Sequence, residues 1–421
     1  MRFYEETFGC TMNQGESRQL VRALIELGHM RVFTPEESDL VLINTCVVIR
    51  PTELKIMKRL REVNQLGKKM IIAGCLPAVS RASLRKEFPE AMIIDPGHYG
   101  NFKNEVMERF GKGDTSYNKL IPQISGILPI SQGCLGNCTY CLTKAARGDL
   151  SSRPIEILVA TASELLKEGS KEILVTAQDT GCYGFDKDAD LPELLGRLSS
   201  IDGEFFIRVG MMNPDSLEPI LERMIEAYAS QKVYKFLHLP VQSGSPSVLK
   251  KMGRGYSPSD FMRQVERFRD RFPTMTIATD IITGFPGETD EDHEMSMDII
   301  KRTRPNIVNV TRYSARPGTP AARAKEQVPQ RISKDRSRDM TELRFEIAKE
   351  HYSQFIGRTM RVLVTEVGKK DTVIARSIEY IPVVVPKKDI GIGQTIEVEI
   401  TSAASTHLSG RLLRPSLQGV R

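Results

Sequence analysis

Three cysteines in one short segment could hold an iron–sulfur cluster. Residues 134–141 read C-L-G-N-C-T-Y-C, which places Cys134, Cys138 and Cys141 in a single loop. Three thiolates, which are soft and donate charge, can bind three irons of a 4Fe–4S cube and leave the fourth iron open. An open iron can bind a small chelating ligand, whereas a fourth thiolate would give a plain electron carrier. The spacing therefore predicts a cluster that takes part in chemistry.

The alternative is half of a structural zinc site, because Cys138-x-x-Cys141 alone is also a common zinc pair. Zinc would require a second Cys or His pair some dozen or two residues further on, and none follows. The two-cluster ferredoxin pattern needs another Cys followed by Pro, which is missing as well. The segment therefore favours a cluster over zinc.

A second set of cysteines lies in the first hundred residues. Cys10, Cys46 and Cys75 each come just after a predicted strand, in G-C-T, T-C-V and G-C-L. In an open parallel sheet the carboxyl ends of the strands share one edge, where ligands bind. We expect the three thiolates to converge there on a second cluster with an open iron, although any one of them could be a buried structural cysteine. The seventh cysteine, Cys182, lies outside any ligand motif and is interpreted as a bystander, with a persulfide carrier as the alternative.

The elements that position the second set form a βαβ series, which predicts a doubly wound parallel sheet. Strands are expected over 2–8, 39–45, 69–73 and 91–95, and helices over 17–28 and 51–66. A stretch rich in Gly, Lys and Asp, residues 111–118, is expected to be a linker.

The elements that position the first set alternate in the same way and predict a partial barrel of the TIM type, (β/α)6. Strands are expected over 127–131, 172–177, 205–211, 235–241, 276–284 and 307–314, and helices over 155–168, 191–199, 214–229, 257–271 and 289–303. Polar and glycine-rich segments follow these strands. They would therefore meet at one mouth of the barrel, as a cofactor site requires.

The carboxy-terminal part predicts a small β-barrel behind a charged helix, which is expected over 331–355. Short strands are expected over 360–366, 373–376, 381–385, 394–401 and 408–413. From Gly357 to Arg421 there are ten Lys or Arg and six Asp or Glu, a net charge of +4 out of +6 for the chain. The positive charge suits a groove that follows a phosphate backbone, and a purely structural barrel is the alternative.

Length and composition agree with three domains, over residues 1–111, 125–355 and 357–416 of the 421. The amino terminus has no apolar signal region, and no run approaches the roughly 18 apolar residues of a membrane span. We therefore expect a cytoplasmic protein that does not enter the membrane. Seven cysteines in such a chain favour metal or redox chemistry over disulfides.

The order of these three parts resembles the methylthiotransferases, a branch of the radical S-adenosylmethionine enzymes, over roughly residues 1–415. The motifs that carry the resemblance are G-C-T-M-N-Q-G-E-S at 9–17, I-N-T-C at 43–46, A-G-C-L at 73–76, Q-G-C-L-G-N-C-T-Y-C at 132–141, H-L-P-V-Q-S-G-S at 238–245 and D-I-I-T-G-F-P-G-E-T at 280–289. The last part looks like a TRAM domain, which binds RNA in this family.

The segment after Cys141 narrows the resemblance. It reads L-T-K-A-A-R-G-D-L-S-S, similar to the archaeal and eukaryotic threonylcarbamoyladenosine branch, and it lacks the proline usual in the bacterial branches. The implied function is conversion of N6-threonylcarbamoyladenosine next to the tRNA anticodon to its 2-methylthio derivative. The alternatives are methylthiolation of isopentenyladenosine in tRNA, methylthiolation of a ribosomal protein aspartate, and a non-catalytic iron–sulfur protein that binds RNA.

The resemblance implies two 4Fe–4S clusters with different tasks. The cluster on Cys134, Cys138 and Cys141 would bind and reduce S-adenosylmethionine, and the resulting 5'-deoxyadenosyl radical would take hydrogen from carbon 2 of the adenine. The cluster on Cys10, Cys46 and Cys75 would carry the sulfur that joins this carbon. A further S-adenosylmethionine would donate the methyl group. The reaction also requires tRNA, an electron donor and a sulfur source.

Four polar residues at the expected mouth could orient the cofactor or the base: Asp179, Arg208, His238 and Gln242. Arg208 could pair with the carboxylate of the cofactor. For each of them the alternative is a structural hydrogen bond within the barrel.

Four residues near the same mouth carry further expectations. Tyr140 could pack beside the adenine of the cofactor, or be a surface aromatic. Lys144, Arg147 and Arg316 would suit contacts with phosphates, and ordinary surface charge is the alternative.

Overall fold

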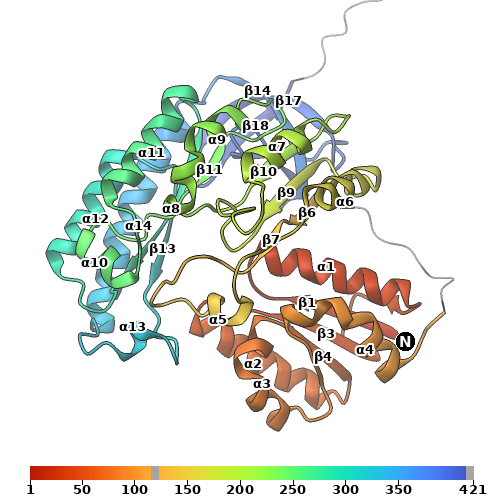
Figure 1. Cartoon of the computed structure of the whole chain (residues 1–421). Helices are drawn as coiled ribbons and strands as arrows, with labels where there is room; N and C mark the ends of the chain where they lie inside the picture. Colours follow the sequence, from red (N-terminus) through yellow and green to blue (C-terminus); the bar gives the residue numbers. More distant parts are fainter. Residues whose placement is uncertain (115–122, 414–421) are drawn as a thin grey trace, which may run out of the picture.

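The chain folds into three parts that follow one another along the sequence (Figure 1). The computed structural model describes residues 1–114 and 123–413. It contains a five-stranded parallel sheet, two three-stranded parallel sheets and a closed five-stranded barrel, which confirms the predicted fold class. Residues 115–118 of the predicted linker and 414–416 of the predicted last domain lie outside the described ranges. No helix within those ranges is both long and apolar enough to cross a bilayer.

The first part is a doubly wound parallel sheet with the strand order β2-β1-β3-β4-β5. Its elements are β1 (Arg2–Thr7), α1 (Thr11–Glu26), β2 (Met30–Arg31), β3 (Leu40–Thr45), α2 (Arg50–Gln65), β4 (Lys69–Gly74), α3 (Cys75–Glu87), β5 (Met92–Ile93), the 3-10 helix η1 (Pro96–Asn101) and α4 (Phe102–Phe110). Helices α1 and α4 cover one face of the sheet, and α2 and α3 cover the other. Every residue of β3 is buried, because this central strand is covered on both faces. The strand order reverses between β1 and β3, where open α/β sheets bind their ligands.

Two helices of this part differ from the sequence prediction. Helix α1 begins at Thr11, directly after Cys10, whereas the expected helix began at residue 17. Helix α3 begins at Cys75 itself and was not predicted. Its third residue, Pro77, is tolerated because the first N–H groups of a helix have no partner within the helix. Both differences place a cysteine at the start of a helix.

The second part is an open barrel of six parallel strands in chain order, in two sheets, β10-β9-β6 and β11-β12-β13. The sheets are joined by a bridge between Ile207 and Val233. The strands are β6 (Ser125–Pro129), β9 (Glu172–Thr176), β10 (Phe206–Val209), β11 (Phe236–His238), β12 (Thr276–Thr283) and β13 (Ile307–Arg312), with a small pair, β7 (Ser131–Gln132) and β8 (Ser151–Ser152), near the mouth. The six predicted strands are thus all present, although β10 and β11 are shorter than expected.

Helices of this part lie mostly on the outside of the barrel, and one of them, α5 (Thr143–Arg147), packs beside α3 of the first part (Figure 1). The helices are α5, α6 (Ile155–Lys167), α7 (Leu191–Ser199), α8 (Pro214–Leu217), η3 (Glu218–Ile220), α9 (Leu221–Ala227), α10 (Pro246–Met252), α11 (Pro258–Arg271), α12 (Asp290–Thr303), α13 (Pro320–Arg323) and the long α14 (Gln330–Ser353). The single helix expected over 214–229 is broken into three pieces at Pro219, because proline cannot donate the helical hydrogen bond.

The third part is a closed barrel of antiparallel and parallel pairs with the order β14-β15-β16-β18-β17. Its strands are β14 (Thr359–Val367), β15 (Thr372–Arg376), β16 (Pro382–Pro386), β17 (Thr395–Ala403) and β18 (Leu408–Leu412), close to the predicted ranges. Tyr380 packs against Tyr234 and Phe236, near the amino ends of the central strands. The small barrel therefore covers that end of the central barrel, and the carboxyl ends of the strands remain for a site.

Candidate functional site

Cys10, Cys46 and Cys75 meet at the carboxyl edge of the first sheet. Cys46 directly follows β3, and the segment before Cys10 lies on it so closely that a Cβ at Gly9 would be 3.2 Å from the Cys46 Sγ. Burial raises the pKa of the Cys46 thiol, and the neighbouring Cys10 raises it further. Burial also raises the pKa of Cys75 to about 11, with Glu16 and Cys46 adding to the shift and Arg147 opposing it. The structure thus brings together the three thiols predicted for the second cluster.

Two glycines make this convergence possible. Gly9 and Gly74 have φ angles of +117° and +98°, which residues with a side chain rarely adopt. A Cβ at Gly74 would lie 2.3 Å from both the Asn44 Oδ1 and the Thr45 carbonyl oxygen. The chain turns sharply at both glycines, so that the following cysteines stand at the amino ends of α1 and α3. Helix amino ends stabilise negative charge, which suits thiolate ligands.

Cys134, Cys138 and Cys141 lie in the loop between β7 and α5, and all three are half-buried. A Cβ at Gly136 would be 3.4 Å from the Cys134 Sγ and 3.6 Å from the Cys138 Sγ, so the loop wraps closely around these sulfurs. Backbone N–H groups of Gly136 and Thr143 donate to the sulfurs of Cys134 and Cys141, at 3.2 and 3.3 Å. Such hydrogen bonds support thiolate ligands of iron–sulfur clusters.

Contacts with neighbouring segments hold this cysteine loop in place. The Gly133 N–H donates to the Gln178 side chain, at 2.8 Å, and the Thr139 N–H to the Met252 carbonyl, at 3.0 Å. The Lys144 ammonium donates to the Cys134 carbonyl and pairs with Asp149. The loop is therefore fixed by the segments after β9 and α10 and by its own helix.

The donor sets fit clusters of iron and sulfur. Each set consists of thiols alone, and within residues 1–114 and 123–413 no three or more His, Cys, Asp or Glu are placed to hold a single metal ion. In a cluster each thiolate binds a different iron atom, so its ligands need not converge on one point. Burial raises the pKa of Cys134 to about 11, with Asp179 adding to the shift, and cluster assembly would displace this proton.

Asp179 is fully enclosed and makes hydrogen bonds inside the barrel. Its carboxylate accepts from the Ser216 hydroxyl at 2.6 Å and from the N–H groups of Gly181 and Asn213 at 3.0 Å. Burial raises its pKa, although these hydrogen bonds oppose the shift. The contacts match the structural alternative, in which Asp179 joins the loops after β9 and β10. Cys182 is also buried and donates to the Asp179 carbonyl, at 3.2 Å.

Arg208 is half-buried in β10 and contacts the small barrel. Its guanidinium stacks over Phe236, at 5.1 Å from the ring centre, and over Tyr380 of the small barrel, at 5.7 Å. Its Nε is buried without a hydrogen-bond partner among the described residues. Pairing with a cofactor carboxylate remains a prediction for this residue, and its visible contacts are aromatic.

His238 and Gln242 lie nearer the mouth. The His238 Nε2 is 3.1 Å from both carboxylate oxygens of Asp280, and Asn309 donates to the same carboxylate at 2.7 Å. Burial alone would raise the pKa of Asp280, but the hydrogen bonds and charge of His238 and the hydrogen bond from Asn309 outweigh it and lower the pKa. Gln242 has a left-handed φ of +67°, and its backbone bridges to β12. Its side chain makes no hydrogen bond with any other described residue.

Arg254 was not predicted from the sequence, yet its positive charge acts on one of the barrel thiols, Cys138. Its Nη2 donates to the Tyr140 hydroxyl at 2.6 Å, and its charge opposes the rise in the pKa of Cys138, which burial causes. Within the part of the chain that the structure describes, its Nε is buried without a hydrogen-bond partner. The sequence signal was weak, since Arg254 lies in a short turn after α10 with no motif of its own. Tyr140 itself is partly buried and packs edge-on against Phe285, at 6.0 Å between ring centres.

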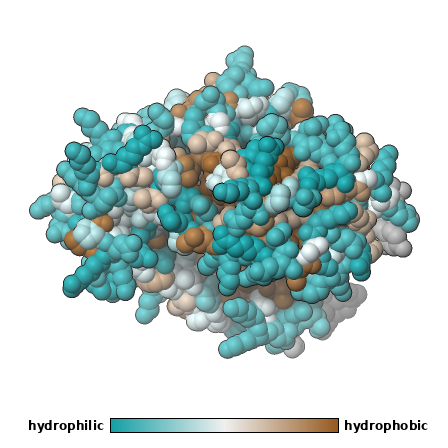
Figure 2. All heavy atoms as spheres, turned by 90° about the horizontal axis from the view of Figure 1, so that it is seen from below, coloured by the Kyte–Doolittle hydropathy of each residue, from teal (hydrophilic) through white to brown (hydrophobic). Residues whose placement is uncertain are grey.

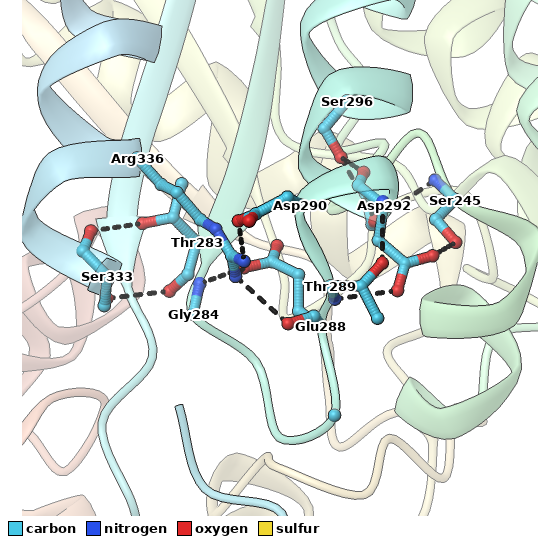
Figure 3. Close-up of polar contacts among 12 residues, drawn as sticks. Ser245, Thr283, Gly284, Glu288, Thr289, Asp290, Asp292, Ser296, Ser333 and Arg336 are labelled. Atoms are coloured by element: carbon cyan, nitrogen blue, oxygen red, sulfur yellow. Dashed lines mark hydrogen bonds and ion pairs between the residues drawn. The ribbon is translucent and has the colours of Figure 1, made fainter. Parts of the chain in front are cut away.

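The loop after β12 is closed by a buried ion pair and helix caps (Figure 3). Glu288 accepts from the Gly284 N–H at 2.6 Å and from Arg336 of α14 at 2.7 Å. Asp292, in the first turn of α12, accepts from the Ser245 hydroxyl, which belongs to the loop after β11. These contacts tie two loops of the mouth to each other and to α14.

For two arginines the prediction of phosphate contacts is wrong, and so is the alternative that they are ordinary surface charges. Arg147 and Arg316 are 4% and 3% exposed, and each pairs with a glutamate of the first part, Glu16 and Glu53 respectively. Both cross the junction between the first part and the central barrel. The sequence could not show this, because a side chain 131 or 263 residues away supplies the partner.

Figure 2 shows the face at the bottom of Figure 1, which is mostly hydrophilic, with apolar side chains gathered in hollows near its middle. Val48 and Leu135, each within two residues of a cysteine of the two sets, are 58% and 54% exposed. On the small barrel, Lys370 and Lys387 are both exposed. The turns that carry them are neighbours, since the Lys387 N–H donates to the Asp371 carbonyl, at 3.0 Å.

Comparison with family models defines the class of protein. Residues 128–300 match the Radical SAM superfamily, residues 2–95 match Uncharacterized protein family UPF0004, and residues 353–413 match the TRAM domain. The radical S-adenosylmethionine methyltransferase TsrM from Kitasatospora setae has a similar fold, with a TM-score of 0.57 and 13% identity over 76% of this chain and 77% of that one. The protein is a radical S-adenosylmethionine enzyme with a TRAM domain.

Curated relatives identify the family within this class. The chain is 40% identical to the probable threonylcarbamoyladenosine tRNA methylthiotransferase of Pyrococcus horikoshii, over 98% of this chain and 100% of the relative. It is 35% identical to the threonylcarbamoyladenosine tRNA methylthiotransferase of Xenopus laevis, over 99% of this chain and 78% of the relative. The chain belongs to the threonylcarbamoyladenosine tRNA methylthiotransferase family.

Proposed function

We propose that this protein converts N6-threonylcarbamoyladenosine, next to the anticodon of tRNA, to its 2-methylthio derivative. The observation that carries the proposal is the juxtaposition of two sets of three thiols, one from each of two parts of the chain. The seven residues from Cys141 to Arg147 include α5 and span about 13 Å, and the Arg147 Nε lies 3.3 Å from the Cys75 Sγ. A substrate atom activated at one set could therefore receive an atom held at the other.

The thiols are well suited to two 4Fe–4S clusters, each with an open iron. We propose Cys134, Cys138 and Cys141 as the ligands of one, and Cys10, Cys46 and Cys75 as the ligands of the other. Reductive cleavage of S-adenosylmethionine is the chemistry that the barrel site supplies when it is loaded, and the other site supplies sulfur. Electrons and sulfur must come from partners, a reductant and a sulfur donor.

The residues of the mouth prepare the site for this chemistry. Arg254 places a positive charge beside Cys138 and Tyr140, where it would favour binding of a carboxylate. His238 and Gln242 are the two predicted contacts that lie nearer the mouth, and Asp179 and Arg208 would act from behind it by holding loops and strands. Loops fixed by buried ion pairs would keep water away from a reactive radical.

Binding of tRNA is assigned to the TRAM domain and to the face between the two sets of thiols. The exposed lysines of the small barrel suit phosphates, and exposed apolar side chains beside the thiols suit a base taken out of its stack. We also propose the three domains at the predicted limits, 1–111, 125–355 and 357–416, and a cytoplasmic location, where tRNA is modified.

The decisive experiment compares tRNA nucleosides from cells with and without this protein by mass spectrometry. The 2-methylthio derivative of N6-threonylcarbamoyladenosine should disappear with the protein and return when it is restored. An unchanged peak, or loss of the isopentenyladenosine derivative instead, would show that the substrate is wrong. A protein that only binds RNA would form no 5'-deoxyadenosine when reconstituted anaerobically with S-adenosylmethionine and a reductant.

A further inference from the structure

Arg147 crosses from the central barrel into the first part of the chain. It is the last residue of α5, in the segment that follows the barrel cysteines, and its side chain is only 1% exposed. Helix α5 packs beside α3, which begins with Cys75. The guanidinium therefore lies among residues of the thiol site in the other part, although it comes from the barrel.

Each nitrogen of the guanidinium makes a hydrogen bond. Its Nε donates to the Cys75 Sγ at 3.3 Å, and its two Nη atoms bind both carboxylate oxygens of Glu16. The Nη2 also lies 3.3 Å from the Asn13 Oδ1, which in turn accepts from the Cys10 Sγ at 3.3 Å. Arg147 is thus connected to two of the three thiols of this site.

The pairing with Glu16 and the contact with sulfur have different consequences. Glu16 balances the buried charge, which a lone arginine in this place would leave uncompensated. The remaining N–H points at a thiol that is expected to be a cluster ligand. Hydrogen bonds to the sulfurs of a cluster tune its reduction potential, because they stabilise the more negative, reduced form.

A lysine could not take over this role. Its ammonium is a single compact charge, whereas the planar fork of arginine can bind a carboxylate on one side and a sulfur on another. The geometry thus separates two functions, charge balance and donation to sulfur, that conservative substitution can test.

On the basis of the proposed function, we propose that Arg147 is a positioning residue of the site formed by Cys10, Cys46 and Cys75. It donates a hydrogen bond to the Cys75 sulfur and thereby raises the reduction potential of the cluster held there. Because the arginine comes from the barrel, this cluster reaches its working potential only when the two parts are docked.

The test measures the potential of this cluster alone. Replacing Cys134, Cys138 and Cys141 together by alanine removes the barrel cluster, so that redox titration followed by electron paramagnetic resonance reports only the other one. In this background Arg147→Lys should shift the midpoint potential to a more negative value while the iron content stays at about four per chain. Arg147→Gln should shift it in the same direction.

Arg336→Lys is the matched control, because Arg336 forms another buried pair with a glutamate, Glu288, away from the thiols. It should lower thermal stability and leave the potential unchanged. A potential in Arg147→Lys equal to that of the parent would overturn the proposal, and so would an equal shift in Arg336→Lys. The measurement needs no tRNA, so an unchanged midpoint potential in Arg147→Lys would leave the proposed function standing. Conversely, the potential can still be measured if the tRNA nucleosides prove to be unchanged.

Discussion

Replacing Cys10 by alanine should separate the cleavage of S-adenosylmethionine from the insertion of sulfur. Cys10 belongs to the first part of the chain, and within residues 1–114 and 123–413 its sulfur makes a single hydrogen bond, to Asn13 at 3.3 Å. The iron content of the reconstituted protein should fall from about eight to about four per chain, since each 4Fe–4S cluster holds four. Formation of 5'-deoxyadenosine should continue, because the barrel thiols are untouched, and the methylthio product should be lost.

The structure also predicts that the variant remains folded. Cys10 is exposed, so the loss is limited to one hydrogen bond, at most about 1.5 kcal/mol. Cys10→Ala is thus a cleaner test than Cys75→Ala, which would empty a buried position and leave the Arg147 Nε without its sulfur partner. Circular dichroism on heating would check the fold, and iron analysis and chromatography of both products would check the chemistry.

The matched control is Cys182→Ala, which removes the seventh cysteine, buried in the central barrel. It should keep about eight irons and both products, because Cys182 is predicted to be a bystander. Normal methylthio product from Cys10→Ala would remove the second cluster from the mechanism. Loss of iron in Cys182→Ala would show instead that the ligand sets are assigned wrongly.

Three further predictions concern other parts of the molecule. Arg254→Met should slow formation of 5'-deoxyadenosine at least tenfold, because it removes the positive charge beside Cys138, and iron content should not change; full activity would contradict this. The double variant Lys387→Glu, Lys388→Glu should weaken tRNA binding and leave cleavage of S-adenosylmethionine unaffected. The slope of the logarithm of the tRNA binding constant against the logarithm of the salt concentration should fall in magnitude by roughly 0.7 to 0.9 for each phosphate that the protein no longer neutralises. An unchanged slope would exclude these lysines from the interface. Burial lowers the pKa of His351 to about 4, so between about pH 6.5 and 4 the unfolded chain binds a proton that the folded chain does not, and stability falls as the pH is lowered. The melting temperature should therefore fall less in His351→Gln than in the parent protein between pH 7 and pH 5. Equal falls would refute the lowered pKa of His351.

Local sequence patterns were sufficient for most of the fold. The strands that precede Cys46 and Cys75 were predicted to within one residue, because a run of buried apolar residues between charged and glycine-rich segments is a strong signal. The start of α1 was missed by six residues, since Cys10 and Gly15 give no helix signal of their own. The two sets of cysteines were also evident, because three thiols at strand ends or in one loop are unusual at any spacing.

Tertiary contacts decided what surrounds those thiols. Arg147 and Arg316 look like surface cations in the sequence, yet docking of the first part onto the barrel buries both beside glutamates. Arg208 stacks on Tyr380, a residue of a separate barrel. In each case the partner is far away in the chain, and no local pattern specifies it.

The sequence by itself determined which atoms could bind iron and which edge of each sheet they would occupy, because both depend on residue type and on the short-range alternation of strands and helices. Only the tertiary structure decided that a side chain following one set of thiols reaches into the other. That contact depends on how two separately folded parts pack, and the burial of Arg147 against Glu16 and Cys75 exists only once they have done so.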